Sequence, residues 1–255
     1  MTSKLEVRDV SFSYNHNQDK KILKDINLHL QDGELISLLG VSGGGKTTLF
    51  NIIAGLYRPD TGQVLLDGED ITGQPGRVSY MLQKDMLLPY RTVEDNIALP
   101  MLIKGMDKKK ARGIVSEHLA DFGLEGTQKK YPAQLSGGMR QRAALLRTYL
   151  FSADVALLDE PFSALDTFTK SEMHRWYLDV MSRIRLSTIF ITHDVDEAIL
   201  LSDRIYLLGG RPGYINGEIV IAQPKPRRKD FNLSEAFLDY KREIVSRIIE
   251  VPRKE

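Results

Sequence analysis

Apolar and polar positions along this chain follow a pattern that predicts strands separated by helices. They alternate from Leu5 to Val10 and, more loosely, from Ile22 to Leu30, which is typical of strands that bury one face. Short apolar runs predict further strands, and helical stretches separate the later ones, as a doubly wound parallel sheet requires. These runs occupy residues 35–39, 63–66, 78–82, 155–158, 188–191 and 205–208. The pattern therefore predicts an α/β protein.

A long helical block interrupts this alternation. From about Thr92 to Phe151 the pattern is helical, and Lys108 to Leu119 has an amphipathic body behind a basic opening. We expect the basic run at 108–110 to be a solvated helix end and not a binding patch. The block predicts an inserted subdomain. The expected domain covers residues 1–222, with a core over 1–84 and 153–222 and a helical subdomain over 85–152.

The last thirty or so residues predict a connector and a terminal helix. Residues 223–229 (QPKPRRK) are typical of an exposed, stiff connector, and Asn232 or Ser234 would cap the helix that follows. Together, 223–255 would form a linker and an amphipathic helix. We expect its apolar face to pack on the domain, the alternative being a regulatory or partner surface. That single stripe would comprise Phe237, Leu238, Ile244, Val245, Ile248 and Ile249.

Composition narrows the class of protein. The chain has 255 residues, a formal net charge of +1 and no cysteine, so it predicts no disulfide and gives no general reason to expect nucleic acid as a partner. Its polar N-terminus does not read as a signal peptide. No apolar run approaches the roughly 18 residues that span a bilayer. We expect any membrane role to depend on a partner chain.

Residues 40–47 (GVSGGGKT) match the phosphate-binding pattern G-x-x-x-x-G-K-[ST]. The buried strand predicted at 35–39 precedes them, and a helix predicted from Thr47 to Leu56 follows. A glycine-rich turn with an incidental lysine is the alternative, but this strand–loop–helix context argues against it. The segment predicts that the chain binds a nucleoside triphosphate.

The chemistry of phosphate binding explains these residue types. Glycines let the backbone fold tightly and aim N–H groups at phosphate oxygens, where the start of a helix adds partial positive charge. Lys46 would reach the β- and γ-phosphates, and the Thr47 hydroxyl would bind Mg²⁺. The expected cradle consists of Gly40, Val41, Ser42, Gly43, Gly44, Gly45, Lys46, Thr47 and Thr48.

Two acids follow the strand at 155–158. Ligands bind at the carboxyl ends of strands in open α/β sheets, so Asp159 there suits Mg²⁺ ligation. Glu160 could polarise a water for attack on the γ-phosphate. A solvated strand end is the alternative for this pair taken alone; with the phosphate loop upstream, a catalytic pair is favoured.

A second glycine-containing segment precedes another helix. Leu135-Ser136-Gly137-Gly138 opens a helix predicted from about Gly137 to Leu150, which again offers a hydroxyl and glycine amides to an anion. One nucleotide needs only one such cradle. The presence of a second one suggests that residues 135–138 contact a nucleotide that is held mainly by another copy of the chain.

In this order, these motifs resemble those of ABC-type ATPases, and the resemblance covers roughly residues 4–222. Tyr14 resembles the aromatic residue that stacks on adenine, and Gln83 the glutamine that meets Mg²⁺ and the transmembrane partner. Residues 163–166 (SALD) resemble the loop that contacts the facing subunit. His193 resembles the switch histidine that touches the γ-phosphate. The other histidines, His16, His29, His118 and His174, are expected to be surface or packing residues.

The resemblance implies a fold and a shared site. The fold is a P-loop NTPase (RecA-like) core with an N-terminal antiparallel β subdomain and an inserted α-helical subdomain. Two subunits would form a head-to-tail homodimer around ATP, with Ser136, Gly137, Gly138 and Met139 facing the twin's nucleotide. Met139 departs from the glutamine of many members, which affects hydrogen bonding near the ribose. Lys46, Glu160 and His193 would be catalytic, and Thr47, Gln83 and Asp159 would hold Mg²⁺.

Residues 85–96 (DMLLPYRTVEDN) are most similar to the importer branch for nitrate, sulfonate and taurine, which includes importers of thiamine precursors. The resemblance implies an ATP-hydrolysing subunit on the cytoplasmic face of the membrane. Its partners would be permease subunits and, through them, an extracytoplasmic solute-binding protein. The alternative is a soluble ABC-type ATPase acting on DNA or ribosomes; balanced charge and one cassette argue against it, so we expect no nucleic acid partner.

Overall fold

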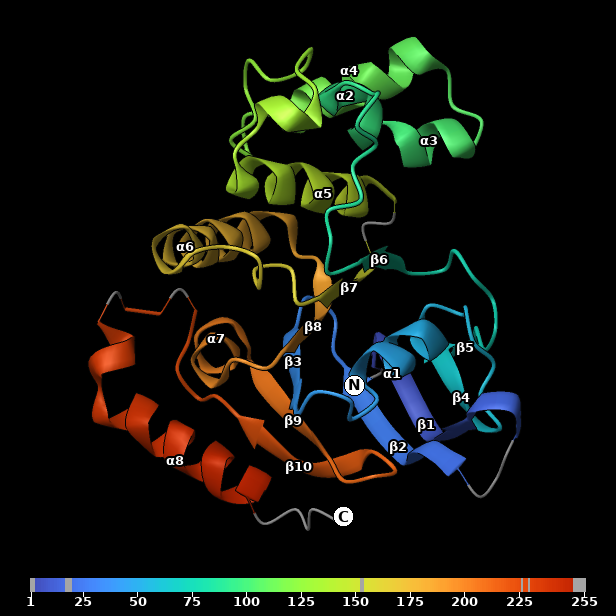
Figure 1. The fold of residues 1–255 in the computed structure, drawn as a ribbon, viewed down its shortest axis with the longest axis vertical. Coiled ribbons are helices and arrows are strands. Elements are labelled where there is room, and N and C mark those ends of the chain that lie inside the picture. Colours follow the sequence, from blue (N-terminus) through green and yellow to red (C-terminus); the bar gives the residue numbers. More distant parts are fainter. Residues whose placement is uncertain (1–2, 17–19, 152–153, 226, 229, 250–255) are drawn as a thin grey trace.

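In this computed structural model, two β-sheets with helices around them form the larger part of the chain, and a lobe of helices lies at one end (Figure 1). The structure describes residues 3–16, 20–151, 154–225, 227–228 and 230–249. None of the helices in these ranges combines the length and the apolar character that crossing a bilayer requires.

The strands whose ends form the candidate site belong to a six-stranded sheet. Its strand order is β10-β9-β3-β8-β7-β6, and every neighbouring pair is parallel except β10 and β9. The inner strands are buried along their whole length, which explains their continuous apolar sequence. The strands are β3 (Leu35–Gly40), β6 (Ser79–Met81), β7 (Val155–Asp159), β8 (Ser187–Thr192), β9 (Arg204–Gly209) and β10 (Tyr214–Val220).

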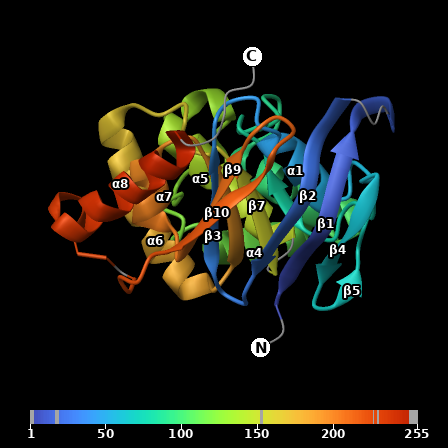
Figure 2. The same ribbon diagram turned by 90° about the horizontal axis from the view of Figure 1, so that it is seen from below.

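An antiparallel sheet lies beside it, on the right in Figure 2. Its order is β2-β1-β4-β5, from β1 (Leu5–Ser13), β2 (Lys21–Leu30), β4 (Thr61–Leu66) and β5 (Glu69–Asp70). Helix α1 (Lys46–Ile53) shares one apolar core with both sheets, in which Phe50 and Ile36 are fully buried. The expected fold, a mixed α/β cassette with an antiparallel sheet and a parallel core sheet, is confirmed.

The helical lobe occupies the top of Figure 1. It contains α2 (Val93–Ile97), α3 (Leu99–Ile103), α4 (Lys108–His118) and α5 (Gly137–Phe151). Side-chain caps fix where two of these begin: Thr92 accepts the N–H of Asp95, and Asp107 accepts two N–H groups of α4. Below the lobe, α6 (Thr167–Ile184) is capped by Asp166.

The C-terminal part contains a strand that the sequence pattern did not predict. Strand β10 pairs with β9, but its sequence has Asn216 and Gly217 in the middle and an irregular register there, which hides the strand pattern. Helix α7 (Val195–Leu201) packs against α8 (Glu235–Ile249), the helix predicted at the C-terminus. Ser234 caps α8 by accepting the N–H of Phe237, as expected for one of the two candidates.

The single apolar stripe expected on α8 is wrong. Phe237 and Ile244 are buried against α7 and the sheet, whereas Leu238 and Val245 are 44% and 39% exposed. Consecutive residues of a helix point about 100° apart, so the stripe divides into a buried and a solvent-facing row. The side chain of Ile249 lies outside the described part.

The connector before α8 is held against the domain. Lys225 forms an ion pair with Asp203 at 2.6 Å, and Arg227 donates to the backbone oxygens of Leu200 and Ser202. The expectation of an exposed spacer is therefore wrong at these two positions. Residues 226 and 229 lie outside the described part.

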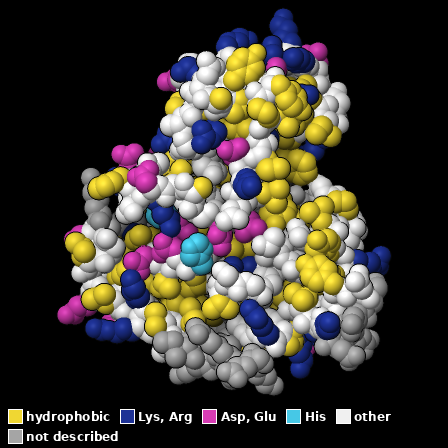
Figure 3. Space-filling model, viewed as in Figure 1, with side chains coloured by type: hydrophobic (Ala, Val, Ile, Leu, Met, Phe, Trp, Pro, Cys, Tyr) yellow, Lys and Arg dark blue, Asp and Glu magenta, His cyan; other side chains and the backbone are white. Residues whose placement is uncertain are grey.

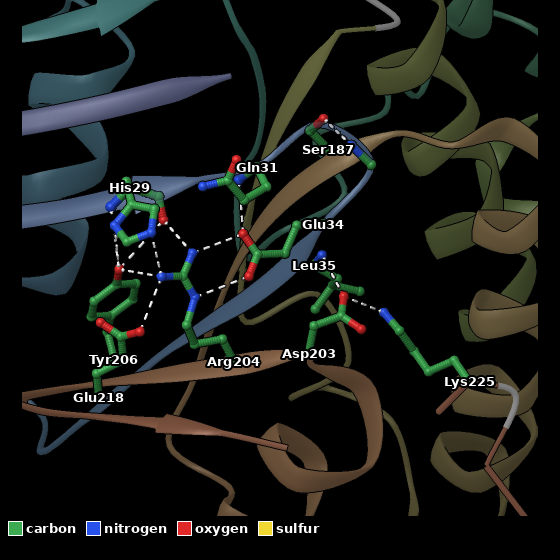
Figure 4. Close-up of polar contacts among 11 residues, drawn as sticks. His29, Gln31, Glu34, Leu35, Ser187, Asp203, Arg204, Tyr206, Glu218 and Lys225 are labelled. Carbon is green, nitrogen blue, oxygen red and sulfur yellow. Dashed lines mark hydrogen bonds and ion pairs between the residues drawn. The ribbon is translucent and has the colours of Figure 1, made fainter. Parts of the chain in front are cut away.

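A buried arginine fastens the two sheets together (Figure 4). Arg204 of β9 donates to both carboxylate oxygens of Glu34, at 2.9 and 2.8 Å, and to Glu218 of β10 at 3.0 Å. Its Nη1 lies 2.6 Å from Nε2 of His29 on β2, which Tyr206 also contacts at Nδ1. Burial alone would lower the pKa of Arg204, but the hydrogen bonds to Glu34 and Glu218 outweigh it and raise that pKa. One guanidinium thus joins β2, β9, β10 and the start of β3.

Candidate nucleotide site

The phosphate loop (residues 40–47) connects the end of β3 to the start of α1. Gly40 must be glycine because a Cβ there would lie 2.4 Å from the backbone oxygen of Leu208 on β9. Gly45 has φ +94°, and a Cβ on it would meet Leu23 at 2.7 Å. Gly43 also has a positive φ of 78°. The glycines therefore allow both the tight turn and its close approach to β9 and β2.

Lys46 folds back over this loop. Its Nζ donates to the backbone oxygens of Gly40 and Val41 at 2.8 and 3.0 Å, and the residue is buried. Burial lowers the pKa of Lys46, while the charges of Glu160 and Asp159 oppose that shift. The ammonium group is thus placed at the loop together with two carboxylates.

Asp159 ends β7 beside the start of α1. Its Oδ2 accepts from the Thr47 hydroxyl at 3.2 Å and from the Tyr80 hydroxyl at 3.5 Å. Burial raises the pKa of Asp159, against the effect of the Thr47 hydrogen bond and of Lys46. Tyr80 was not among the predicted site residues. The feature that could have identified Tyr80 is its position on β6, where it pairs in register with Leu157 of β7, two residues before Asp159.

Glu160 stands at the meeting point of three neighbouring strand ends. His193, after β8, places Nδ1 at 3.1 Å from Oε1 of Glu160, and Gln83, after β6, donates to Oε2 at 3.3 Å. Gln83 also donates to the Ser163 hydroxyl at 3.4 Å. Figure 3 shows acidic and histidine side chains gathered near the middle of this face, below the helical lobe. The parallel sheet brings these residues together although they are far apart in the sequence.

Tyr14 lies beside the first turn of α1. Its hydroxyl is 3.2 Å from that of Thr48, and its ring is 48% exposed. The ring packs edge-on against Phe12 and against Tyr57, which the sequence did not single out. An exposed aromatic face beside the phosphate loop can stack on a planar base.

The second cradle is built elsewhere in the fold. Ser136 is exposed at the start of α5, and its hydroxyl accepts the N–H of Met139 at 3.3 Å. A Cβ on Gly137 would lie 3.4 Å from Leu165, just before α6, and a Cβ on Gly138 would lie 3.4 Å from Thr169, in the first turn of α6. Within the described residues, the neighbours of these two glycines thus lie in and near α6, and not in the phosphate loop.

The residues fit Mg²⁺ only together with phosphate oxygens. Thr47 and Asp159 offer the hydroxyl and carboxylate oxygens that this cation prefers, with Gln83 bonded to the adjacent Glu160. No group of three or more His, Asp or Glu side chains able to hold a metal exists within the described residues. Ligands from a nucleotide would therefore be needed to complete the site.

Comparisons with known proteins agree with this geometry. A family model described as "ABC transporter" matches residues 23–163. The formylaminopyrimidine import ATP-binding protein ThiZ of Halalkalibacterium halodurans is 38% identical over 91% of this chain and 89% of its own length. The nitrate import ATP-binding protein NrtD of Synechocystis is 38% identical, covering 88% of this chain and 86% of its own. The aliphatic sulfonates import ATP-binding protein SsuB of Bacillus cereus is 39% identical, with coverage of 88% and 87%.

Solved structures are similar over most of the chain. The ATP-binding cassette MJ0796, in a dimeric post-hydrolysis state bound to ADP and Pi, has a TM-score of 0.72 at 27% identity. The match covers 86% of this chain and all of that one. The structure of cbiO1 from Clostridium perfringens has a TM-score of 0.78 and covers 96% of this chain and all of its own, but at 24% identity it supports the fold alone.

Proposed function

The chain belongs to the ABC transporter family as the ATP-binding subunit of an importer, and from that premise we propose how its residues hydrolyse ATP and drive uptake of a small solute. The proposal depends on one observation: Glu160, His193 and Gln83 lie together beside the phosphate loop. A carboxylate held by two neighbours at the ends of adjacent strands is suited to positioning a water molecule.

Binding is assigned to the loop and the aromatic residue beside it. Backbone N–H groups of residues 40–48 would hold the phosphates, with Lys46 turning from its loop carbonyls to their oxygens. Tyr14 would stack on the base. Thr47, Gln83 and Asp159 would hold Mg²⁺, which when bound bridges phosphate oxygens and neutralises their charge.

Hydrolysis is assigned to Glu160, with Lys46 and His193 stabilising charge. Glu160 would orient the water and accept its proton, and the Gln83 amide would fix the other carboxylate oxygen. His193 lies at 3.1 Å from Glu160 and would reach the terminal phosphate from the end of β8. Little side-chain chemistry beyond positioning is required.

A homodimer would complete the site. Ser136 is exposed, and together with Gly137, Gly138 and Met139 it would contact the nucleotide on the twin's phosphate loop. The phosphate loop of the same subunit lies in another part of the fold. The dimeric state of the cassette MJ0796 supports this arrangement. ATP would then close two subunits, and hydrolysis would release them.

An apolar cleft where the helical lobe meets the core is the proposed contact with a permease. The cleft encloses about 240 Å³ between α1, β6, α3 and α5, and Leu56 on its lining is 58% exposed. Leu82 and Met86, just after β6, are also exposed. Figure 3 shows hydrophobic side chains along this border. Exposed apolar surface of this kind favours a protein partner, which would hold the subunit at the cytoplasmic face of the membrane.

The relatives' names give formylaminopyrimidine, nitrate and aliphatic sulfonates as their solutes. With the resemblance of residues 85–96, they support nitrate, a sulfonate such as taurine, or a thiamine precursor as the transported solute. The importer names among the relatives favour this function over an ATPase acting on DNA or ribosomes. The test is reconstitution of the chain with its permease and binding protein in vesicles. ATP hydrolysis should rise when one of these solutes loads the binding protein; no stimulation by any of them would contradict the solute proposal.

A further inference from the structure

The connection between β9 and β10 lies directly against the phosphate loop. Gly213 donates its N–H to the oxygen of Ile22 at 2.8 Å and accepts the N–H of Lys24 at 2.9 Å, which anchors the connection to β2. A Cβ on Gly213 would lie 2.3 Å from the backbone oxygen of Gly44. The two backbones are therefore in contact, and a side chain is excluded between them.

Arg211 projects from this anchored connection toward the phosphate loop. Its Nη2 lies 3.5 Å from the point where a Cβ on Gly43 would sit. Arg211 is exposed, and within the described residues its side chain forms no hydrogen bond or ion pair. Among the residues that the structure describes, this guanidinium therefore has no paired carboxylate, and it lies against the loop that is expected to bind phosphate.

The charge of the site makes this position favourable for an anion. Lys46 supplies one positive charge at the loop, whereas Asp159 and Glu160 supply two negative ones. A nucleoside triphosphate stays anionic even with Mg²⁺ bound, so a second cation nearby would reduce its repulsion from the two carboxylates. The planar guanidinium has the geometry that binds phosphate oxygens in pairs.

We propose that Arg211 binds the phosphate chain of the nucleotide held by the phosphate loop. The connection between β9 and β10 then acts as an additional arm of the site, carrying a cation that the phosphate-binding pattern does not include. This inference rests on the nucleotide binding at residues 40–47. Because Gly213 fixes the backbone, the side chain of Arg211 needs only rotamer changes to reach the ligand.

The test compares nucleotide affinities of the purified full chain by calorimetry, with ATP and ADP in the presence of Mg²⁺. Arg211→Ala should weaken ATP binding roughly 10- to 100-fold, the effect expected for losing a hydrogen-bonded charge. Arg211→Lys should recover part of that loss, because charge remains but paired donation does not. The dependence of affinity on salt should also fall in Arg211→Ala. Arg242→Ala is the matched control and should bind as wild type, because it removes an exposed arginine that pairs with Asp239 on the same helix, α8.

Two results would overturn the inference. One is an affinity of Arg211→Ala within about twofold of wild type for both nucleotides while circular dichroism shows a folded chain. The other is unchanged nucleotide affinity with impaired dimerisation, which would assign Arg211 to the twin instead. Lys46→Ala separates this test from the function itself. If Lys46→Ala abolishes binding and Arg211→Ala has no effect, only the role of Arg211 is wrong; if neither has an effect, the nucleotide site is misplaced.

Discussion

Single residues decide whether the phosphate loop can form. Gly40 has an ordinary backbone conformation, so its need for glycine comes from space: β9 passes where a side chain would begin. The neighbouring Gly45 combines a positive φ with the same lack of space, against Leu23. Such positions are fixed by contacts with distant strands, and the sequence pattern identifies them only through the phosphate-binding motif.

Gly40→Ala should lower the free energy of unfolding by about 1–3 kcal/mol, because the backbone of β3 or β9 must shift to admit the methyl group. Urea denaturation of the two proteins measures the difference. Gly113→Ala in α4 is the matched control: nothing lies within 4 Å of its Cβ position, and alanine favours the helix by about 1 kcal/mol. Equal effects of the two substitutions would contradict the role given to β9.

Lys46→Ala should abolish tight ATP binding, since it removes the only side-chain cation supplied by the phosphate loop itself. Calorimetric titration with ATP and Mg²⁺ measures this. Lys109→Ala, an exposed residue near the start of α4, should bind ATP normally. Unchanged affinity in Lys46→Ala would refute the assignment of residues 40–47 to phosphate binding.

At the scale of elements, a group of charges between α6 and α7 holds the segment that carries His193. Asp194 caps α7 by accepting the N–H groups of Asp196 and Glu197, and it pairs with Lys170 of α6 at 2.7 Å. Glu197 is buried and contacts His174 at 2.7 Å and Thr192 through its other oxygen. Through these contacts, α6 fixes the turn between β8 and α7, where His193 lies.

Asp194→Asn should keep the cap but lose the ion pair with Lys170, lowering the free energy of unfolding at neutral pH by about 1 kcal/mol. Burial alone would raise the pKa of Asp194, but the hydrogen bonds from Lys170 and the α7 backbone lower it below its ordinary 3.8. A lowered folded-state pKa means that this stability is present above 3.8 and disappears as the pH falls through that lower value. Urea midpoints of both proteins from pH 7 downward should converge; a difference that stays constant would contradict the ion pair.

The sequence predicted most elements because their signals are local. Each strand of the parallel core is a short apolar run, and the helix after the phosphate loop begins at the lysine of the motif. Strand β10 was missed because its pairing with β9 tolerates Asn216 and Gly217 in mid-strand. Tyr57, Tyr80 and Arg211 were missed because each lies near residues that are far away in the sequence, and the order of residues does not reveal such proximity.

At the scale of the whole molecule, the two cradles lie on different parts of one chain. Glu160→Gln should bind ATP yet fail to hydrolyse it, so two subunits remain closed around the nucleotide. Size-exclusion chromatography with ATP and Mg²⁺ should show a dimer for this variant and a monomer without nucleotide. Adding Ser136→Trp at the exposed start of α5 should prevent the dimer without weakening ATP binding by the monomer. A monomer for Glu160→Gln in every condition would contradict the shared site.

The arginine that joins β2, β9, β10 and the start of β3 has a mechanical consequence for such a cycle. Because one guanidinium holds both sheets, we expect them to move together as one rigid body, so that relative movement would occur at the border with the helical lobe. A permease bound in the cleft at that border would be displaced directly by such a movement. On this proposal, the cluster at Arg204 would direct movement caused by ATP hydrolysis to the cleft where the lobe meets the core, and little of it would be lost between the two sheets.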